Sequence, residues 1–243
     1  MASYRLRTEI PAKHLGASIN DGEADVVVFS KPVRADVDVA RQCKGNATVV
    51  VDICDPHDYS EILRYADRIV VSSEALLELH PTATVIPDPI EGPGGAPHAD
   101  AEMIAWIGHR SNLRALDDWL RKLRVPVVVC TNDTPDTLPW SLEMQAWVYE
   151  AAGKVLVPAT NRFKSANRVA QAIHEGCFVV ASDIPAYRPL RQWAWVGSYP
   201  TGMRWASSRV DLNDIVADGQ RHVREHFAPE RIGEQWRDFL GSI

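Results

Sequence analysis

The sequence predicts an α/β protein made of two Rossmann-like domains, each with a parallel sheet. Short apolar runs alternate with helix-like segments along the 243 residues, and the runs are too uniformly apolar for strands with one face in water. Strands that alternate with helices in this way form right-handed crossovers and parallel sheets. One segment, residues 87–97, interrupts the alternation with three glycines and four prolines, which indicates a domain boundary.

This boundary divides the chain into expected domains. We expect an N-terminal domain at residues 1–88, a linker at 89–99 and a C-terminal domain at 100–225. Residues 226–243 are expected to form a final amphipathic helix. Its apolar face carries four large side chains, which are Ile232, Trp236, Phe239 and Leu240.

The first half begins with a less regular segment. Residues 4–16 predict a short strand followed by a helix, with Pro11 tolerated in its first turn and Gly16 as its stop. Regular alternation follows. Strands are expected at residues 25–30, 48–53, 68–73 and 84–87, and helices at 36–44, 59–66 and 74–80.

The second half repeats the alternation and ends in a tryptophan-rich stretch before its last helix. Strands are expected at residues 103–108, 126–133 including the following loop, 155–157 and 178–181. Helices are expected at residues 113–123, 140–150, before Gly176, and 211–226.

Composition excludes several classes of protein. With 46% hydrophobic and 24% charged residues, the chain is typical of a soluble globular protein. The net charge of −6 gives no overall attraction to nucleic acid or anionic membranes. No apolar run approaches the length of a membrane span, and the N-terminus lacks the apolar core of a signal peptide.

The four cysteines predict no metal site. They lie far apart, without a CxxC pair or neighbouring ligands at metal-site spacing. Cys54 and Cys130 fall in or beside apolar strands, which is typical of buried free thiols. We therefore expect a reduced, cytoplasmic protein.

The helix before Gly176 has cations at its N-terminus, where they are unfavourable unless an anion binds there. Backbone N–H groups, a hydroxyl and positive charge together suit a phosphate or diphosphate. The alternative is that Ser165 only caps the helix and that the cations are solvated. The residues concerned are Lys164, Ser165, Asn167 and Arg168.

A second group of candidate residues follows the early strands. Asp55 and His57 come directly after the strand at 48–53, where a general base with an orienting neighbour could sit. Lys31 follows the strand at 25–30, and ligands of open α/β sheets bind beyond the carboxyl ends of strands. The alternative is that Asp55 opens a turn with Pro56 and caps the next helix.

The segment KSANRVAQAIHEGCFVVASDIPAY, residues 164–187, resembles the nucleotide-sugar-binding segment of GT-B glycosyltransferases of the glycosyl-transferase group 1, family 4-like type. In that family a glutamate five residues before the glycine binds the donor ribose, and an acidic residue eight positions earlier contacts the sugar. Here Gln171 and Phe163 occupy these positions. The resemblance implies the GT-B fold, with two Rossmann-like domains facing across a cleft and the last helix returning to the N-terminal domain.

The same resemblance implies roles for other residues. Gly108 and Arg110 match a glycine and a basic residue that contact the donor phosphate, and Arg7 matches an N-terminal loop over the cleft. The alternative for Arg7 is an arginine on the surface with no ligand. Gln171 would hold the ribose, and Asp55 or His57 would remove the acceptor proton if the reaction inverts. The chain has neither a GxGxxG nor a Walker motif, which disfavours a dehydrogenase or an ATPase.

The implied function is transfer of a hexose or pentose from a nucleoside-diphosphate sugar, first of all a UDP-sugar, to an acceptor hydroxyl. The acceptor classes are a small molecule, a glycan, or a hydroxymethylated base in DNA, as in compact phage-type relatives. No cofactor or metal is required, and the protein is expected to be a monomer or homodimer. The alternative is a catalytically silent relative that acts as a nucleotide-sugar sensor or partner subunit, because the glutamate pair is absent. A sugar-nucleotide epimerase is disfavoured by the short chain.

Overall fold

The computed structural model describes residues 4–19, 24–120, 126–132, 137–159 and 161–243. Contacts divide the chain into two compact units. The N-terminal unit comprises Met1–Glu91, Phe163–Ala166 and His226–Ile243, and the C-terminal unit comprises Gly92–Arg162 and Asn167–Glu225. The loop at 163–166 therefore belongs to the N-terminal unit, although the chain on both sides of it belongs to the other unit.

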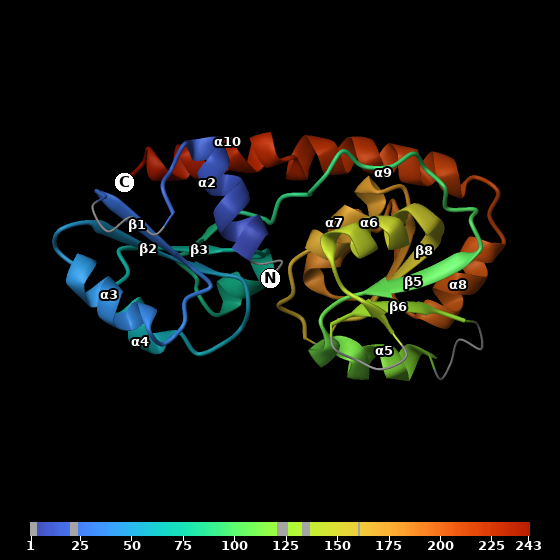
Figure 1. Ribbon diagram of the computed structural model, residues 1–243, viewed down its shortest axis with the longest axis horizontal. Helices are drawn as coiled ribbons and strands as arrows, with labels where there is room; N and C mark the ends of the chain where they lie inside the picture. The colour runs from blue at the N-terminus through green and yellow to red at the C-terminus, as the bar shows by residue number, and fades with distance from the viewer. Residues whose placement is uncertain (1–3, 20–23, 121–125, 133–136, 160) are drawn as a thin grey trace. The chain divides into compact units, whose positions relative to one another are not determined.

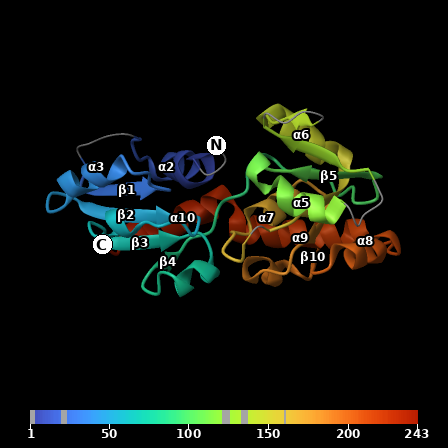
Figure 2. The ribbon, with the colours of Figure 1, turned by 90° about the horizontal axis from the view of Figure 1, so that it is seen from below.

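The N-terminal unit is built on a parallel sheet of four strands in the order β1-β2-β3-β4 (Figures 1 and 2). The prediction of a parallel α/β sheet is confirmed here. The strands are β1 (Val26–Ser30), β2 (Thr48–Ile53), β3 (Arg68–Val71) and β4 (Thr84–Val85).

Two apolar layers cover the faces of this sheet. Successive side chains of a strand point to opposite faces. Val49 and Val51 accordingly pack in one cluster, and Val50 packs in another with Ile232 and Trp236. The first cluster takes its helical side chains from α3 (Asp36–Cys43), α4 (Ser60–Leu63) and η2 (Glu74–Glu78). The second takes them from α10 (Pro229–Leu240), which lies beside α2 (Ile10–Leu15) in Figure 1.

The expected strand at the start of the chain is wrong. Residues Arg5–Glu9 form the π-helix η1, in which the backbone N–H of Ile10 donates to the carbonyl of Arg5. A helical turn can bury the adjacent side chains of Leu6 and Arg7 together, whereas a strand would point them to opposite faces. The expected stop at Gly16 is confirmed, because this residue caps α2 with a left-handed φ of 66°.

The C-terminal unit has a parallel sheet of six strands in the order β10-β9-β8-β5-β6-β7. The chain adds β6 and β7 on one side of β5 and then returns to add β8 on the other side. Adjacent strands whose connections diverge in this way define a topological switch point, here between β5 and β8. The strands are β5 (Met103–Ile107), β6 (Val128–Thr131), β7 (Leu138–Pro139), β8 (Ala152–Val157), β9 (Phe178–Ala181) and β10 (Ala194–Val196).

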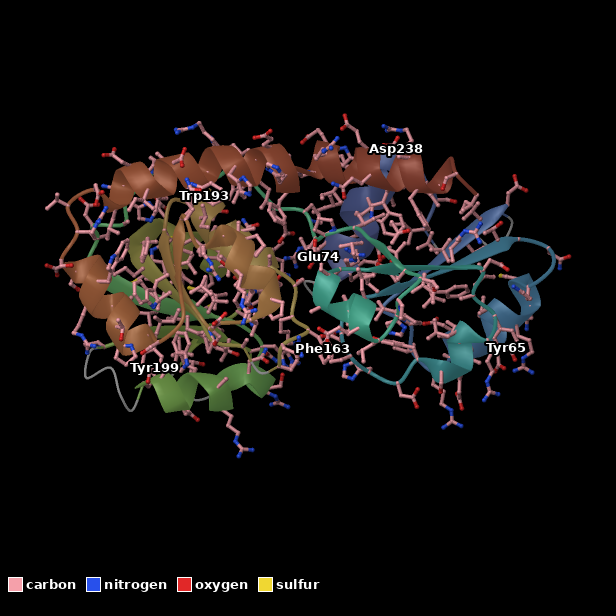
Figure 3. All side chains as sticks on the ribbon, turned by 180° about the vertical axis from the view of Figure 1, so that it is seen from behind. Tyr65, Glu74, Phe163, Trp193, Tyr199 and Asp238 are labelled. Atoms are coloured by element: carbon pink, nitrogen blue, oxygen red, sulfur yellow. The ribbon has the colours of Figure 1, made fainter. Side chains whose placement is uncertain are left out.

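Helices cover both faces of this sheet. Figure 1 shows α5 (Leu113–Leu120) and α9 (Leu212–Phe227) on opposite sides of it. Trp119 of α5 stacks on Tyr199, with ring centroids 4.3 Å apart, and Figure 3 shows Tyr199 next to α5. The other helices are η3 (Arg110–Asn112), α6 (Leu142–Ala151), α7 (Asn167–His174), η4 (Pro185–Leu190) and α8 (Tyr199–Ser207).

Helix α8 lies in the tryptophan-rich stretch to which the sequence assigned no element. A glycine is required at position 202 of this helix, because a Cβ there would lie 2.4 Å from the ring of Trp195. The end of the helix expected at 113–123 and the end of the loop expected at 126–133 fall outside the described residues. Within the described ranges, no helix is long and apolar enough to cross a membrane.

Candidate functional site

A buried ion pair lies at the carboxyl end of the N-terminal sheet. Arg7 is 2% exposed, and its Nε donates a 2.9 Å hydrogen bond to Asp52, which a second guanidinium nitrogen also contacts. Arg7 Nη1 donates to the carbonyl of Ile86 at 2.6 Å and lies 3.6 Å from Asp88. Burial alone would lower the pKa of Arg7, but the two carboxylates outweigh it and raise the pKa.

Arg7 has a structural role within the N-terminal unit, and its role as a cleft residue stays a prediction. Its guanidinium is buried and engaged with groups of the N-terminal unit, which fixes η1 against the ends of β2 and β4. The ring of Trp236 adds a further contact, with its centroid 5.8 Å from the guanidinium carbon.

Asp88 lies beside this pair, and its carboxylate accepts a hydrogen bond from the hydroxyl of Ser165. Burial of Asp88, which is 5% exposed, raises the pKa of its carboxyl, and the Arg7 charge and the Ser165 hydrogen bond oppose that rise only in part. The Ser165 hydroxyl, predicted to bind phosphate, is thus engaged with a carboxylate of the N-terminal unit.

Two lysines share one carboxylate at the same edge of the sheet. Lys31 Nζ lies 2.8 Å from one oxygen of Asp55, and Lys164 Nζ lies 3.2 Å from the other. Burial raises the pKa of Asp55, but the hydrogen bond from Lys31 and the charge of Lys164 lower it below its ordinary value. Asp55 is therefore ionised at neutral pH, and the cluster of Lys31, Asp55 and Lys164 carries one net positive charge.

The backbone at Lys31 supports a functional interpretation of this cluster. Within the described residues it is the one residue other than glycine with a positive φ, 49°. Non-glycine residues in this region store strain, and such strain gathers at ligand sites. The strained turn directs Lys31 toward Asp55 instead of continuing β1.

Two further polar side chains, Cys54 and His57, lie close to Asp55 in the chain. Burial, together with the charges of Asp88 and Asp55, raises the pKa of Cys54 to about 12, so this thiol stays protonated. His57 is exposed, with its ring edge-on to Tyr59 at a centroid distance of 6.3 Å. Asp55 and His57 remain candidates for the general base.

In the C-terminal unit, Gly108 follows β5 at the switch point and brings two side chains together. A Cβ at Gly108 would lie 2.6 Å from the ring of Trp106 and 3.2 Å from Arg168 Nη1. A glycine is therefore required for this close approach. Arg110, two residues later, begins η3 and is exposed, and its backbone N–H donates to Asn132 at 3.3 Å.

Arg168, on the first turn of α7, has a buried donor without a partner. Among the described residues, no hydrogen bond of acceptable geometry is made by its Nη1, by Trp106 Nε1 or by the Tyr187 hydroxyl, although Tyr187 lies close to Arg168. Burial raises the pKa of Tyr187, and the charge of Arg168 and its close approach to the hydroxyl lower the pKa only in part. A buried unsatisfied donor is destabilising by about 1–3 kcal/mol, more for a charged group, unless a ligand supplies the acceptor.

Gln171 lies one turn further along α7 and is 8% exposed. Its Nε2 donates a 2.7 Å hydrogen bond to Glu175. The sequence analysis did not single out Glu175, although the spacing of four residues was a usable signal, since such residues are neighbours on a helix. Trp106 and Tyr187 were also missed, because nothing in a buried aromatic residue of a strand or loop signals a ligand.

The structure thus divides the predicted site residues between the two units. The N-terminal unit holds Arg7, Lys31, Asp55, His57, Lys164 and Ser165, and the C-terminal unit holds Gly108, Arg110, Asn167, Arg168 and Gln171. The group expected at one helix start is split, because the boundary between the units falls between Ala166 and Asn167. Helix α7 begins at Asn167, whose side chain accepts the Arg168 backbone N–H.

Comparison with known proteins identifies the fold. No family model matches the sequence, and no curated protein matches it. Solved structures of GT-B glycosyltransferases match nearly the whole chain, so this chain has the GT-B fold, as predicted.

Three of these structures illustrate the likeness. HepE from Anabaena, solved with UDP and glucose, matches with a TM-score of 0.71 at 12% identity, over 99% of this chain and 83% of HepE. A glycosyltransferase from Rickettsia africae matches with a TM-score of 0.64 at 10% identity, over 98% and 80% of the two chains. A UDP-forming α,α-trehalose-phosphate synthase from Burkholderia vietnamiensis matches with a TM-score of 0.59 at 8% identity, over 85% and 69%.

Proposed function

We propose that the protein is a glycosyltransferase that moves a hexose or pentose from a nucleoside-diphosphate sugar to an acceptor hydroxyl. The observation that carries the proposal is the buried, unpaired guanidinium N–H of Arg168 on the first turn of α7, beside Gly108 at the β5/β8 switch point. Ligands of open α/β sheets bind at such switch points. The likeness to HepE, which was solved with UDP, makes a UDP-sugar the first donor to test.

Arg168 and the start of α7 would stabilise the leaving diphosphate. Negative charge develops on the β-phosphate as the bond to the sugar breaks, and donors that are already in place lower the energy of that state. Arg168 can give a charge-assisted hydrogen bond, and the positive end of the α7 dipole adds to it. Arg110 and the Asn167 side chain complete the proposed phosphate site from within the C-terminal unit.

Lys164 and Ser165 are kept in the proposal as phosphate ligands. They precede α7 directly in the chain, and Lys164 is bound to Asp55 through a side chain that is 25% exposed. A phosphate oxygen would replace the Asp55 carboxylate as the partner of Lys164. The scheme uses cations and the helix N-terminus for charge stabilisation and assigns no residue to a metal or cofactor.

The donor sugar is recognised without the usual acidic residue. Phe163 occupies that position, and its side chain packs in the apolar cluster of the N-terminal unit. Gln171 would bind the ribose of the donor. The sugar hydroxyls are held by groups that the motif does not predict.

The acceptor side is proposed to use Asp55 and His57, with Lys31 and Arg7 as residues of the acceptor side. Asp55 or His57 would accept the proton of the acceptor hydroxyl if the reaction inverts. A small molecule, a glycan and a hydroxymethylated DNA base are the acceptor classes. Retention on a hydroxymethylated duplex that weakens steeply with salt would support the DNA base.

Binding of UDP by isothermal titration calorimetry tests the donor site. We expect the wild type to bind UDP, Arg168→Ala to weaken binding at least about tenfold, and Arg168→Lys to recover part of it. Arg204→Ala is the matched control, because Arg204 is an exposed arginine of the same unit. Absence of UDP binding by the wild type, or equal binding by Arg168→Ala, would overturn the proposed donor site.

A second candidate is a catalytically silent relative that senses a nucleotide sugar or serves as a partner subunit. Gln171 and Phe163 in place of two acidic residues favour it. Donor hydrolysis and sugar transfer separate the two candidates. UDP binding without either reaction, across the donor and acceptor classes named above, would favour the sensor.

A further inference from the structure

A pocket of about 380 Å³ lies at the amino edge of the C-terminal sheet, within the C-terminal unit. It is found where α8 lies against β9 and β10 (Figure 2), and the first residues of these two strands, Phe178 and Ala194, line it. The proposed donor site lies at the opposite, carboxyl edge of the sheet, where ligands of open α/β sheets bind. The pocket is therefore separate from the proposed donor site, and none of its lining residues has a role there.

Aromatic and aliphatic side chains form the walls of this pocket. Trp205 of α8 stacks on Phe178, with ring centroids 5.6 Å apart, and its ring centroid lies 5.7 Å from that of Trp195. Both tryptophans are partly exposed, so the pocket offers aromatic surface to a ligand. The apolar lining residues are Phe178, Ala194, Trp195, Trp205 and Ile215.

Hydrogen-bond donors stand at the rim on two sides of these walls. Arg191 and Gln192 come from the segment between η4 and β10, Arg209 follows α8, and all three are exposed. Arg209 lies over the ring of Trp205, 5.0 Å from its centroid, and donates a 2.6 Å hydrogen bond to Asp211, which balances its charge. Among the described residues, Arg191 has no carboxylate partner, and the Gln192 amide and the Trp205 indole N–H make no hydrogen bond.

This combination of groups suits a sugar ring that carries a carboxylate. A pyranose has apolar C–H faces that can pack on indole rings, and its hydroxyls point outward in several directions and need partners on more than one side. An aromatic acid has a single polar end and would leave the donors on the other side of the pocket without partners. The charge of Arg191 favours an acidic sugar over a neutral one, because a guanidinium binds a carboxylate through two parallel hydrogen bonds. The volume lies within the range of pockets for small ligands.

We propose that this pocket is a binding site for an acidic saccharide, a hexuronic acid residue of a glycan, away from the reaction centre. The rings of Trp195 and Trp205 pack on the sugar. Arg191 binds the carboxylate, and Gln192 binds a hydroxyl. The inference adds a second saccharide site to the proposed function and does not depend on the donor. For an acidic glycan acceptor, such a site raises the effective concentration of the chain at the enzyme.

The test titrates the protein with trigalacturonic acid and follows the indole N–H signals of its eight tryptophans by NMR. We expect the signals of Trp195 and Trp205, assigned from their replacement by Phe, to shift on binding. Maltotriose has no carboxylate for Arg191, and benzoate has no hydroxyls, so each should bind at least about tenfold more weakly. Equal binding of maltotriose or of benzoate at these signals would overturn the assignment to an acidic saccharide.

Variants of the lining test the proposed contacts. Arg191→Ala and Trp205→Leu should each weaken trigalacturonate binding at least about tenfold. Gln192→Ala changes only an exposed side chain, should weaken binding several-fold, and covers the case in which Trp205→Leu does not fold. Arg188→Ala is the matched control, because Arg188 is an exposed arginine of η4 that pairs with Asp183 and does not line the pocket. Unchanged affinity in both Arg191→Ala and Gln192→Ala would overturn the inference.

Competition with UDP separates this site from the proposed donor site. Saturating UDP and Arg168→Ala should each leave trigalacturonate binding unchanged. Displacement by UDP, or loss of binding in Arg168→Ala, would place the saccharide in the donor site and overturn this inference. UDP binding without trigalacturonate binding would also overturn this inference alone, whereas trigalacturonate binding without UDP binding would support it and overturn the proposed donor site.

Discussion

Arg7 and Asp52 form a buried bidentate ion pair although they lie 45 residues apart in the chain. Their side chains are 1% and 0% exposed. The pair joins the first helical turn of the chain to the end of β2, and Asp88 and the carbonyl of Ile86 extend it to the segment after β4. The carboxyl end of the N-terminal sheet, where the proposed acceptor residues lie, is organised around this network.

Removal of one partner of the pair is expected to destabilise the N-terminal unit strongly. Arg7→Met leaves the Asp52 carboxylate buried without its cation, and such a change costs about 3–5 kcal/mol of unfolding free energy. Urea denaturation of the variant and the wild type measures the effect. Arg7→Met combined with Asp52→Leu should cost less than the sum of the single changes, because the Asp52 carboxylate is no longer left without its cation.

An exposed ion pair of the same unit provides the control. Arg231 and Glu234 of α10 are 55% and 56% exposed, and Arg231→Ala should change stability by less than about 1 kcal/mol. Equal losses for Arg7→Met and Arg231→Ala would show that the buried network does not organise this region.

Asp88 should make stability fall as pH rises. Its pKa in the folded protein is raised by burial, so the folded state binds more protons than the unfolded state between the ordinary pKa of an aspartate and the raised value. In that window the contribution of Asp88 to stability is present at low pH and is lost as pH increases. Asp88→Asn removes this titration, and its stability relative to the wild type should increase from pH 4 toward pH 7.

Thermal unfolding of both proteins across that range measures the difference. Other carboxylates titrate in both proteins, so their contributions largely cancel in the comparison. A constant difference between the two proteins would contradict a raised pKa at Asp88.

The two lysines at Asp55 should control its ionisation. Lys164→Met or Lys31→Met removes a cation that stabilises the charged carboxylate, so the pKa of Asp55 should rise in each variant. Because the folded-state pKa of Asp55 is lowered in the wild type, its contribution to stability is present above the ordinary aspartate value and is lost as pH falls through the lowered one. Carboxyl carbon titration by NMR follows the residue directly.

Lys44→Met is the matched control for this titration. Lys44 pairs with Asp67 and is the largest cause of its lowered pKa. The control should therefore raise the pKa of Asp67 and leave that of Asp55 unchanged. An unchanged Asp55 pKa in both Lys31→Met and Lys164→Met would show that the contacts with Lys31 and Lys164 do not persist in solution.

The fold was predictable because its signals are local. Uniformly apolar runs such as residues 48–53 and 178–181 identify buried parallel strands, and left-handed glycines such as Gly16 and Gly176 end helices. The start of the chain was assigned wrongly because the burial of Arg7 depends on Asp52, and no local pattern reports a partner 45 residues away.

The sequence predicted residues of the candidate site only where residue type and spacing indicated them. Arg168 and Gln171 follow from the pattern of the segment at 164–187, but the loop boundary at Ala166 does not. The structure gives Lys164 and Ser165 the partners Asp55 and Asp88, which the sequence did not predict, and their role as phosphate ligands stays a prediction. The partner of a flexible cation can be a residue that is far away in the chain. Local sequence patterns do not show which distant residue this is.

Gly108→Ala tests the close packing beneath the proposed phosphate site. The new Cβ would lie 2.6 Å from the ring of Trp106, which is fully buried and cannot move aside, and 3.2 Å from Arg168 Nη1. Overpacking of this kind destabilises by about 1–3 kcal/mol, and displacement of Arg168 should weaken UDP binding at least about tenfold. Gly241→Ala, where the nearest atom lies 3.2 Å away at the end of α10, is the control and should leave UDP binding unchanged. Because the proposed site depends on the contact between Gly108 and Arg168, full UDP affinity in a folded Gly108→Ala variant would place the phosphates elsewhere.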